Sequence, residues 1–310
     1  MKKTYWILLM LAAVLLVSCG KSITGDVIDD ESEEGMEEVA VKTRKFTFTV
    51  KGDFGGIVVN NEMSDQPALS PRKVKYLYSD DNNITDLWVF DYMNGSLVQS
   101  VHQSNTDNGF GQPQMSLAYG DHHIYFVASR GDSPTVDNDN KSILWASVKD
   151  TFWKNYEVTV GSTSNGNRAV TLDRVVTRLR VTATDEVPTG CASMTITPAV
   201  WYYGLNYVTG APTDAHNSEA KVINVPASYV GTTGQLTTSI FSVSGATEWN
   251  TNVAVVAKNT GGDVIGSATI ANAPFKANRS TDFSGPLFGS AGSMSVSIND
   301  EWSDPYEGTW

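Results

Sequence analysis

The chain has 310 residues, a formal net charge of −12, 41% hydrophobic residues and 18% charged residues. A length of this order predicts about two domains. The apolar content excludes wholesale disorder, which requires low hydrophobicity and high net charge. The acidic balance argues against a nucleic-acid partner, because a protein that binds phosphates needs a basic surface.

The first 18 residues are typical of a lipoprotein signal peptide. Lys2 and Lys3 precede an apolar run from Trp6 to Val17, which fits a signal peptide and is too short for a membrane-spanning helix. The run ends in Leu16-Val17-Ser18 before Cys19, a pattern that resembles the bacterial lipobox. The resemblance implies that Cys19 is acylated and becomes the first mature residue. Its acyl chains would then attach the chain to a membrane.

Residues 19–38 are predicted to form an acidic tether. Residues 20–38 contain eight acidic side chains and a single basic one, Lys21. Like charges repel one another and extend such a segment, so it would hold the folded part away from the membrane. An acidic run near a lipidated cysteine also resembles the surface-export signal of Bacteroidetes lipoproteins. The remaining cysteine, Cys191, then has no disulfide partner and is predicted to be a small buried or half-buried apolar residue.

From residue 39 onward, the pattern predicts an all-β chain. Short β-branched runs alternate with turns, as in the strictly alternating segment Lys45–Val50. The clearest hairpin joins Asp86–Met93 to Ser96–Val101 through Asn94-Gly95, a dipeptide that favours a type I′ turn. Apolar residues spaced by four predict one helix within Ser142–Val158.

The segment 161–168 has a linker composition. It places a domain boundary between an N-terminal β domain, residues 39–165, and a C-terminal β domain, residues 166–310. The later strands follow one another at a spacing that is typical of β-sandwiches. The last of them, Ser293–Ile298, again alternates strictly between apolar and polar residues.

The sequence lacks the motifs of known catalytic and metal sites. It contains no HExxH, no CxxC pair, no G-x-S-x-G elbow and no P-loop. The segment Asp137–Asn140 resembles the start of a calcium loop, but Lys141 stands where a third ligand is needed, so an acidic turn is expected. We therefore predict no metal, no cofactor and no enzymatic activity.

One aromatic cluster leaves two interpretations open. Trp201, Tyr202 and Tyr203 are consecutive, and aromatic side chains either pack in cores and interfaces or stack on sugar rings. The second interpretation predicts a surface glycan-binding lipoprotein, which is the alternative function for this chain.

Several segments together resemble Bacteroidetes fimbrillin-type proteins, the family of fimbrial subunit lipoproteins that includes major and minor fimbrillins, anchors and tips. The order of lipobox, acidic tether and two β domains is similar to theirs. Four segments resemble, in turn, the family's "VFD…G" hairpin, the strand after it, the strand that opens the second domain and a stretch near the C-terminus: Ile84–Gly95, His123–Ala128, Leu172–Val181 and Asn278–Phe288. The resemblance covers most of residues 45–300.

This resemblance implies two tandem transthyretin-like (Greek-key) β-sandwich domains and a structural or adhesive role in cell-surface fimbriae (pili). In stalk subunits of the family, an arginine-specific protease removes the N-terminal segment with its strand. The open groove then accepts a donor strand from the C-terminal region of the next subunit, which is β-augmentation. The implied partners are other fimbrial subunits in a homo- or hetero-polymer, the outer membrane through the lipid on Cys19, and a host or bacterial surface receptor.

Two details of this scheme stay open at the level of sequence. Arg44 is the first candidate for the maturation site and Arg72 the second, although Arg44 is equally explained as an exposed basic residue before a strand. The strand Ser293–Ile298, with the tail Asn299–Trp310, is either the donor or a native edge strand. The sequence is compatible with a stalk, an anchor or a tip subunit.

Overall fold

The computed structural model describes residues 41–53, 74–76, 84–130, 134–218, 220–289 and 294–299. The signal peptide, the acidic tether, Cys19 and Arg72 lie outside these residues. Regular structure in the described part is almost entirely β, which confirms the predicted all-β class. No helix there is long and apolar enough to cross a membrane.

The elements follow one another along the chain with one short 3₁₀ turn, η1, among the strands. They are β1 (Thr43–Asp53), β2 (Val74–Tyr76), β3 (Asp86–Met93), β4 (Ser96–Ser104), β5 (Gln114–Ala118), β6 (Gly120–Ser129), β7 (Thr135–Asp137), β8 (Ser142–Leu144), β9 (Thr151–Val160), β10 (Asn167–Arg174), β11 (Val176–Ala183), β12 (Cys191–Pro198), β13 (Val200–Asn206), β14 (Ala211–Asn217), β15 (Lys221–Asn224), η1 (Ala227–Tyr229), β16 (Thr237–Val243), β17 (Trp249–Asn259), β18 (Val264–Phe275), β19 (Ser280–Gly285) and β20 (Ser295–Asn299).

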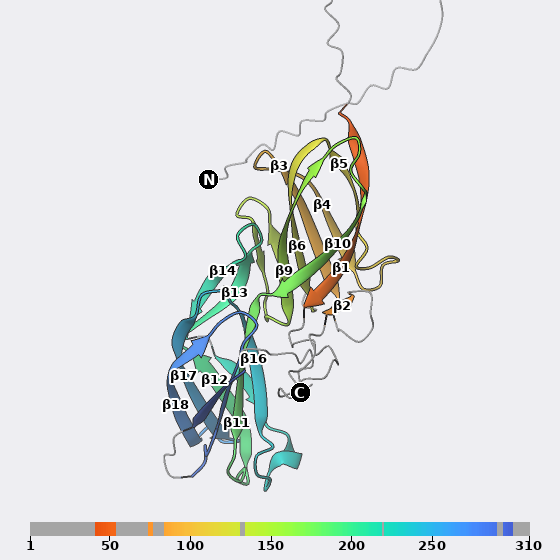
Figure 1. Ribbon diagram of the computed structural model, residues 1–310. Helices are drawn as coiled ribbons and strands as arrows, with labels where there is room; N and C mark the ends of the chain where they lie inside the picture. Colours follow the sequence, from red (N-terminus) through yellow and green to blue (C-terminus); the bar gives the residue numbers. More distant parts are fainter. Residues whose placement is uncertain are drawn as a thin grey trace, which may run out of the picture. The chain divides into compact units, whose positions relative to one another are not determined.

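The first sheet has eight strands in the order β2-β1-β10-β9-β6-β3-β4, with β5 also paired to β1 (Figure 1). Alternate residues of β1, including Phe46 and Phe48, share one buried cluster with residues of β3 and β6. The rings of Phe48 on β1 and Phe126 on β6 lie 5.2 Å apart, although two strands separate β1 from β6 in the sheet. The sheet therefore folds over on itself, and its two halves enclose the core as the layers of a sandwich.

The predicted hairpin of β3 and β4 is confirmed. Asn94 has φ 52° and Gly95 has φ 78°, as a type I′ turn requires. Both faces of β3 are buried, because Leu87 and Val89 point into the first core while Phe90 and its alternating neighbours enter a second cluster. That second cluster includes Tyr207, whose ring stacks on Phe90 with centroids 4.0 Å apart, close to the four-stranded sheet β14-β13-β8-β7.

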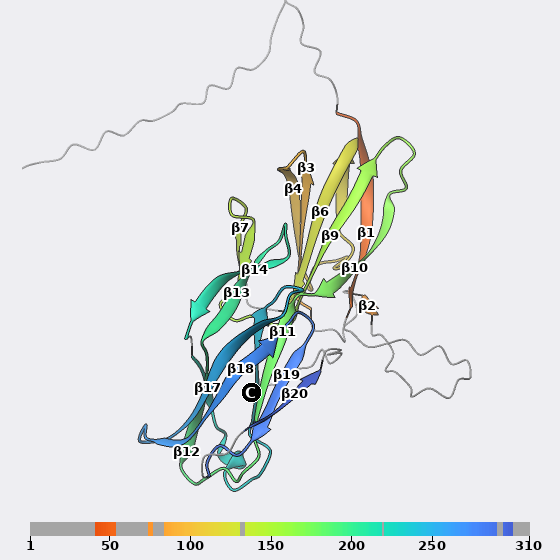
Figure 2. The same ribbon diagram turned by 60° about the vertical axis from the view of Figure 1, so that its left-hand side comes forward.

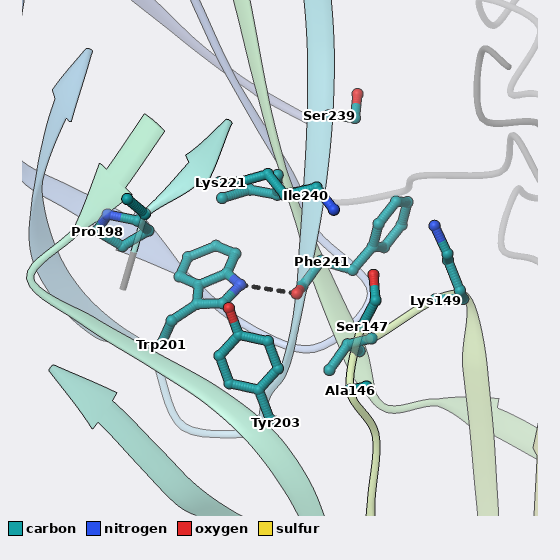
Figure 3. Close-up of a pocket in the computed structure, with 12 residues that line it drawn as sticks. Ala146, Ser147, Lys149, Pro198, Trp201, Tyr203, Lys221, Ser239, Ile240 and Phe241 are labelled. Carbon is teal, nitrogen blue, oxygen red and sulfur yellow. Dashed lines mark hydrogen bonds between the residues drawn. The ribbon is translucent and has the colours of Figure 1, made fainter. Parts of the chain in front are cut away.

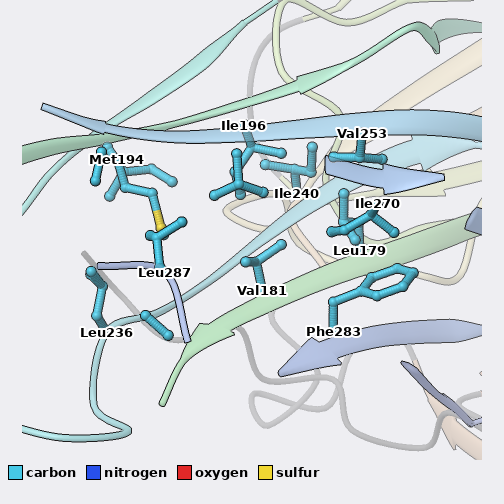
Figure 4. Close-up of a cluster of buried hydrophobic side chains, with 14 of the residues drawn as sticks. Leu179, Val181, Met194, Ile196, Leu236, Ile240, Val253, Ile270, Phe283 and Leu287 are labelled. Atoms are coloured by element: carbon cyan, nitrogen blue, oxygen red, sulfur yellow. The ribbon is translucent and has the colours of Figure 1, made fainter. Parts of the chain in front are cut away.

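Two further sheets form the second sandwich. Their strand orders are β16-β11-β19-β20 and β15-β12-β17-β18, and Figure 2 shows β19 and β20 at one edge. Side chains from both sheets meet in one cluster (Figure 4), among them Val181 on β11, Ile196 on β12 and Val253 on β17. Cys191 is buried at the rim of this core with a free thiol, and burial raises the pKa of that thiol.

The predicted helix within Ser142–Val158 is wrong. The segment forms β8 and most of β9, and β9 pairs along its length with β6. The apolar residues spaced by four do not share one buried face. Val148 enters the second buried cluster, whereas Phe152 enters the core of the first sandwich. Long-range pairing with a central strand overrides the weak local preference of the segment.

Strands on both sides of the predicted domain boundary pair with strands from the other side of it. β10 begins at Asn167, after the predicted boundary, yet it pairs in parallel with β1 and antiparallel with β9 of the first sheet. β7 and β8, which precede the boundary, join the sheet that contains β13. The division of the chain at residue 165 stays a prediction, and it does not coincide with the edge of the first sheet.

A buried ion pair lies where β10 ends. Nε and Nη2 of Arg174 donate to the two carboxylate oxygens of Asp150 at 2.7 and 2.9 Å. Nη1 of Arg174 donates to Oδ1 of Asn278 at 3.0 Å, and the guanidinium lies 5.2 Å from the centre of the Phe152 ring. The side chains of Arg174 and Asp150 are 0% and 2% exposed, so this pair ties three separate chain segments together inside the protein.

Candidate functional site

Arg44, the candidate maturation site, lies inside β1. It pairs with Leu117 of β5, and its guanidinium donates to the backbone oxygen of Ser162. Proteases favour exposed loop tips, whereas the backbone at Arg44 is part of a sheet. The core residues Phe46 and Phe48 follow Arg44 on the same strand, so a cut after Arg44 would leave most of β1 in place. Cleavage at Arg44 stays a prediction.

Trp201, a candidate for glycan stacking, is a core residue of the second sandwich. Its side chain is 1% exposed, its Nε1 donates to the backbone oxygen of Phe241 at 2.7 Å, and its ring meets Phe275 edge-on at 5.3 Å. A ring enclosed in this way offers no face to a sugar, so the stacking prediction for Trp201 is wrong. The tryptophan pattern alone did not distinguish a core residue from a surface platform.

Tyr202 and Tyr203 are half-buried and do not form a common platform with Trp201. The Tyr202 ring lies perpendicular to Trp249 at 5.2 Å, while the Tyr203 ring lies 4.8 Å from His216. Successive side chains of a strand point to opposite faces of the sheet, which separates Tyr202 from its two neighbours. Tyr203 retains exposed surface beside a small cavity that is described below.

The C-terminal strand β20 is the feature that sequence and structure both single out. It pairs antiparallel with β19, and Phe283 lies opposite Val296. Val296 is 53% exposed and Ile298 is 45% exposed. A strand normally buries one of its two faces, yet the apolar residues of β20 stay open to solvent. Over the described residues 294–298 the predicted alternation is real, but only the first apolar residue, Met294, packs against the core, while Val296 and Ile298 do not.

The chain leading to β20 is anchored by one carboxylate. Asp185 accepts hydrogen bonds from the backbone N–H groups of Leu287, Phe288 and Gly289 at 2.9, 2.6 and 2.9 Å. Partial burial raises the pKa of Asp185, but these three donors together outweigh that effect and hold the pKa below its ordinary value. The segment after β19 is thereby fixed up to Gly289, and β20 follows beyond it.

The polar groups of the first sandwich serve the fold. His122 contacts Oδ1 of Asp91 through Nδ1 at 2.7 Å and the backbone oxygen of Ala118 through Nε2 at 2.9 Å, which links β3, β6 and the end of β5. Across the described ranges, no group of three or more His, Cys, Asp or Glu side chains is placed to hold a metal ion.

The segment Asp137–Asn140 is an acidic turn. The Asp137 carboxylate accepts hydrogen bonds from the backbone N–H groups of Asp139 and Asn140, both at 3.0 Å. The backbone and side-chain donors of Asn140 lower the pKa of Asp137. The carboxylate is thus satisfied by its own turn.

Several solved structures are similar to this chain, all at low sequence identity. An adhesin candidate from Bacteroides ovatus has a TM-score of 0.49 and 10% identity, with 83% of this chain and 93% of that chain covered. A candidate polysaccharide-binding protein from Bacteroides thetaiotaomicron has a TM-score of 0.49 and 9% identity, covering 83% and 96%. The tip fimbrial protein Mfa3 from Porphyromonas gingivalis has a TM-score of 0.42 and 12% identity, covering 82% and 99%.

Because every TM-score is below 0.5, we infer no function from these similarities. A search of the curated proteins found no match. Residues 134–310 match the model of a family of unknown function, DUF6562, and since this match covers more than half of the chain, the protein belongs to that family.

Proposed function

We propose that this chain is a structural and adhesive subunit of cell-surface fimbriae, exported as a lipoprotein precursor and joined to its neighbours by strand exchange. The lipobox at Cys19 would anchor at least the precursor to the outer membrane, and the acidic tether would extend the folded part away from it. The partners would be other fimbrial subunits, and a surface receptor would bind the assembled polymer. The proposed role involves no enzymatic reaction.

The observation that carries this proposal is the exposed apolar face of β20. Val296 and Ile298 alternate on one face of this strand and remain about half exposed, so burying them against another subunit would contribute free energy that the single chain does not gain. Their strand is held to the body through its pairing with β19. These properties favour a strand that exchanges between chains.

β-augmentation supplies the physical mechanism. When β20 leaves β19, the edge of β19 presents free N–H and C=O groups that template another strand. Main-chain hydrogen bonds provide affinity and alternate side chains provide specificity. We propose that the pairing between chains keeps the register of the single chain, with Thr281 opposite Ile298 and Phe283 opposite Val296. Val296 and Ile298 would then become buried where the bodies of the two subunits meet.

Charging the exposed face of β20 tests the proposal. We expect the double variant Val296→Asp/Ile298→Asp to abolish polymer formation, because association would bury two carboxylates among apolar groups. The free energy of unfolding of the single chain should change by only about 0.5 kcal/mol, since both positions are exposed. Polymers are measured by electron microscopy and by analytical ultracentrifugation, and stability by urea titration.

Val264→Asp is the matched control, because Val264 is 59% exposed on β18 of the other sheet. This variant should polymerise normally. Polymers of normal length from the Val296→Asp/Ile298→Asp chain would rule out β20 as the exchanging strand.

A further inference from the structure

A small cavity beside the second sandwich is not explained by strand exchange. It encloses about 250 Å³ between the loop that follows β8 and the strands β13 and β16, with the start of β15 at its rim (Figure 3). It is smaller than the pockets of drug-sized ligands, which measure about 300–1,000 Å³. A single sugar ring is a ligand of suitable size.

The walls of this cavity are already formed in the free chain. The hydrogen bond from Trp201 to Phe241 fixes the back wall, and the backbone N–H of Tyr202 donates to Oγ of Ser242 at 3.0 Å, which joins β13 to β16. On the facing side, the backbone N–H of Trp145 donates to the backbone oxygen of Tyr203 at 3.0 Å and ties the loop to β13. A preformed site loses little conformational entropy when it binds a ligand.

The charge of the cavity is opposite to that of the chain. Lys149 and Lys221 both line it, in a protein with a net charge of −12. Among the residues that the structure describes, no acidic side chain lines the cavity and no ion pair involves either lysine. The neighbouring Asp150 does not compensate Lys149, because its carboxylate is bound by Arg174. Two ammonium groups at one small cavity favour an anionic ligand.

The remaining lining groups suit a ring that carries hydroxyl groups. Ser147 and Ser239 line the cavity and are half-buried, and neither hydroxyl is engaged by another described residue. Tyr203 adds a partly exposed aromatic ring, and Figure 3 shows it below Trp201 and across from Ser147 and Lys149. Aromatic faces pack against the apolar face of a sugar, while serine hydroxyls both donate and accept hydrogen bonds.

We propose that this cavity binds one carboxylate-bearing sugar residue, a uronic acid of a surface or host glycan. The sugar ring packs against Tyr203, its carboxylate contacts Lys149 and Lys221, and its hydroxyl groups contact Ser147 and Ser239. This site is independent of β20, so it adds a carbohydrate-binding activity to a subunit whether or not that subunit exchanges strands. It replaces the stacking platform that the buried Trp201 cannot provide.

Binding of galacturonic acid oligomers to the full chain, measured by isothermal titration calorimetry, tests the proposal. We expect Lys149→Ala and Lys221→Ala each to weaken binding about tenfold, because each removes one hydrogen bond to a charged group. Lys258→Ala is the matched control, since Lys258 is an exposed lysine on β17 outside the cavity, and it should bind like the unmodified chain. Circular dichroism checks that all three variants are folded.

Two comparison ligands test whether binding requires both the negative charge and the sugar ring. Neutral galactose oligomers of the same length should bind at least about tenfold more weakly, because they lack the charge-assisted contacts. Equal binding of neutral and acidic oligomers, or binding that ignores both lysine substitutions, would overturn the proposal. Tighter, lysine-dependent binding of a short glutamate peptide would also overturn it and would identify an acidic-peptide site.

Discussion

Replacing Arg174 with alanine is expected to destabilise the protein by about 3–5 kcal/mol, because the carboxylate of Asp150 would stay buried without its direct ion-pair partner. The carboxylate of Asp150 would lose both of its short contacts with the guanidinium. Asn278 would lose a donor, and the contact over Phe152 would disappear. The free energy of unfolding, measured by urea denaturation, checks this expectation.

An exposed ion pair provides the matched control for Arg174→Ala. Nζ of Lys154 lies 2.9 Å from Oδ2 of Asp173, and the two side chains are 40% and 55% exposed. Exposed pairs of this kind contribute about 0–1 kcal/mol, so Lys154→Ala should have little effect. Equal losses in the two variants, or a loss below about 1 kcal/mol in Arg174→Ala, would contradict the structural role of the buried pair.

Trp201→Ala is the second change with a large expected effect, a loss of about 3–5 kcal/mol in unfolding free energy. The substitution removes a fully buried ring that contacts Phe275, and it leaves the backbone oxygen of Phe241 without its indole donor. Urea denaturation measures the loss. Val222→Ala is the control, since Val222 is 59% exposed and an exposed substitution changes stability by only about 0.5 kcal/mol.

This second variant separates the two interpretations of the aromatic cluster. A core residue affects folding, whereas a surface platform affects binding and leaves stability unchanged. Unaltered stability in Trp201→Ala would therefore contradict the core position of the ring. Because Trp201 also forms the back wall of the cavity, the sugar-binding test relies on the two lysines instead.

Local sequence signals predicted the strands and turns correctly where neighbouring residues determine the backbone conformation. Asn94-Gly95 predicted the β3–β4 hairpin because few other residue pairs tolerate two successive positive φ angles. The alternation in Lys45–Val50 and in Ser293–Ile298 likewise predicted β1 and β20. The all-β class followed from many such short signals, each of them independent of the tertiary structure.

Long-range contacts explain what the sequence did not show. The parallel pairing of β1 with β10 joins segments that lie more than 100 residues apart, with Thr47 opposite Asn167. Nothing in the linker-like composition of residues 161–168 indicates that the next strand returns to the first sheet. The segment that contains Val148 was similarly predicted as helix, because its burial depends on two cores that only the folded chain forms.

The cavity could not have been found from the sequence for the same reason. Lys149 and Lys221 are separated by 72 positions in the printed sequence, and each looks like an ordinary solvated charge. Only the folding of the loop after β8 against β13 and β15 brings them to one cavity. The consecutive aromatic residues Trp201, Tyr202 and Tyr203 were easier to recognise in the sequence. They suggested a sugar-binding surface, but the ring of Trp201 is buried in the core.

Disulfide trapping between two chains that each carry one introduced cysteine tests strand exchange most directly. Ser284 and Ser295 lie opposite each other on β19 and β20, and side chains in this arrangement are close enough for a disulfide. One chain carries Ser284→Cys and the other carries Ser295→Cys, while a chain with both substitutions shows that the disulfide closes within one molecule. Our account predicts covalent dimers that join the two introduced cysteines when the single variants are mixed and polymerised. Polymers that form without this cross-link, while the double variant closes its disulfide, would contradict it.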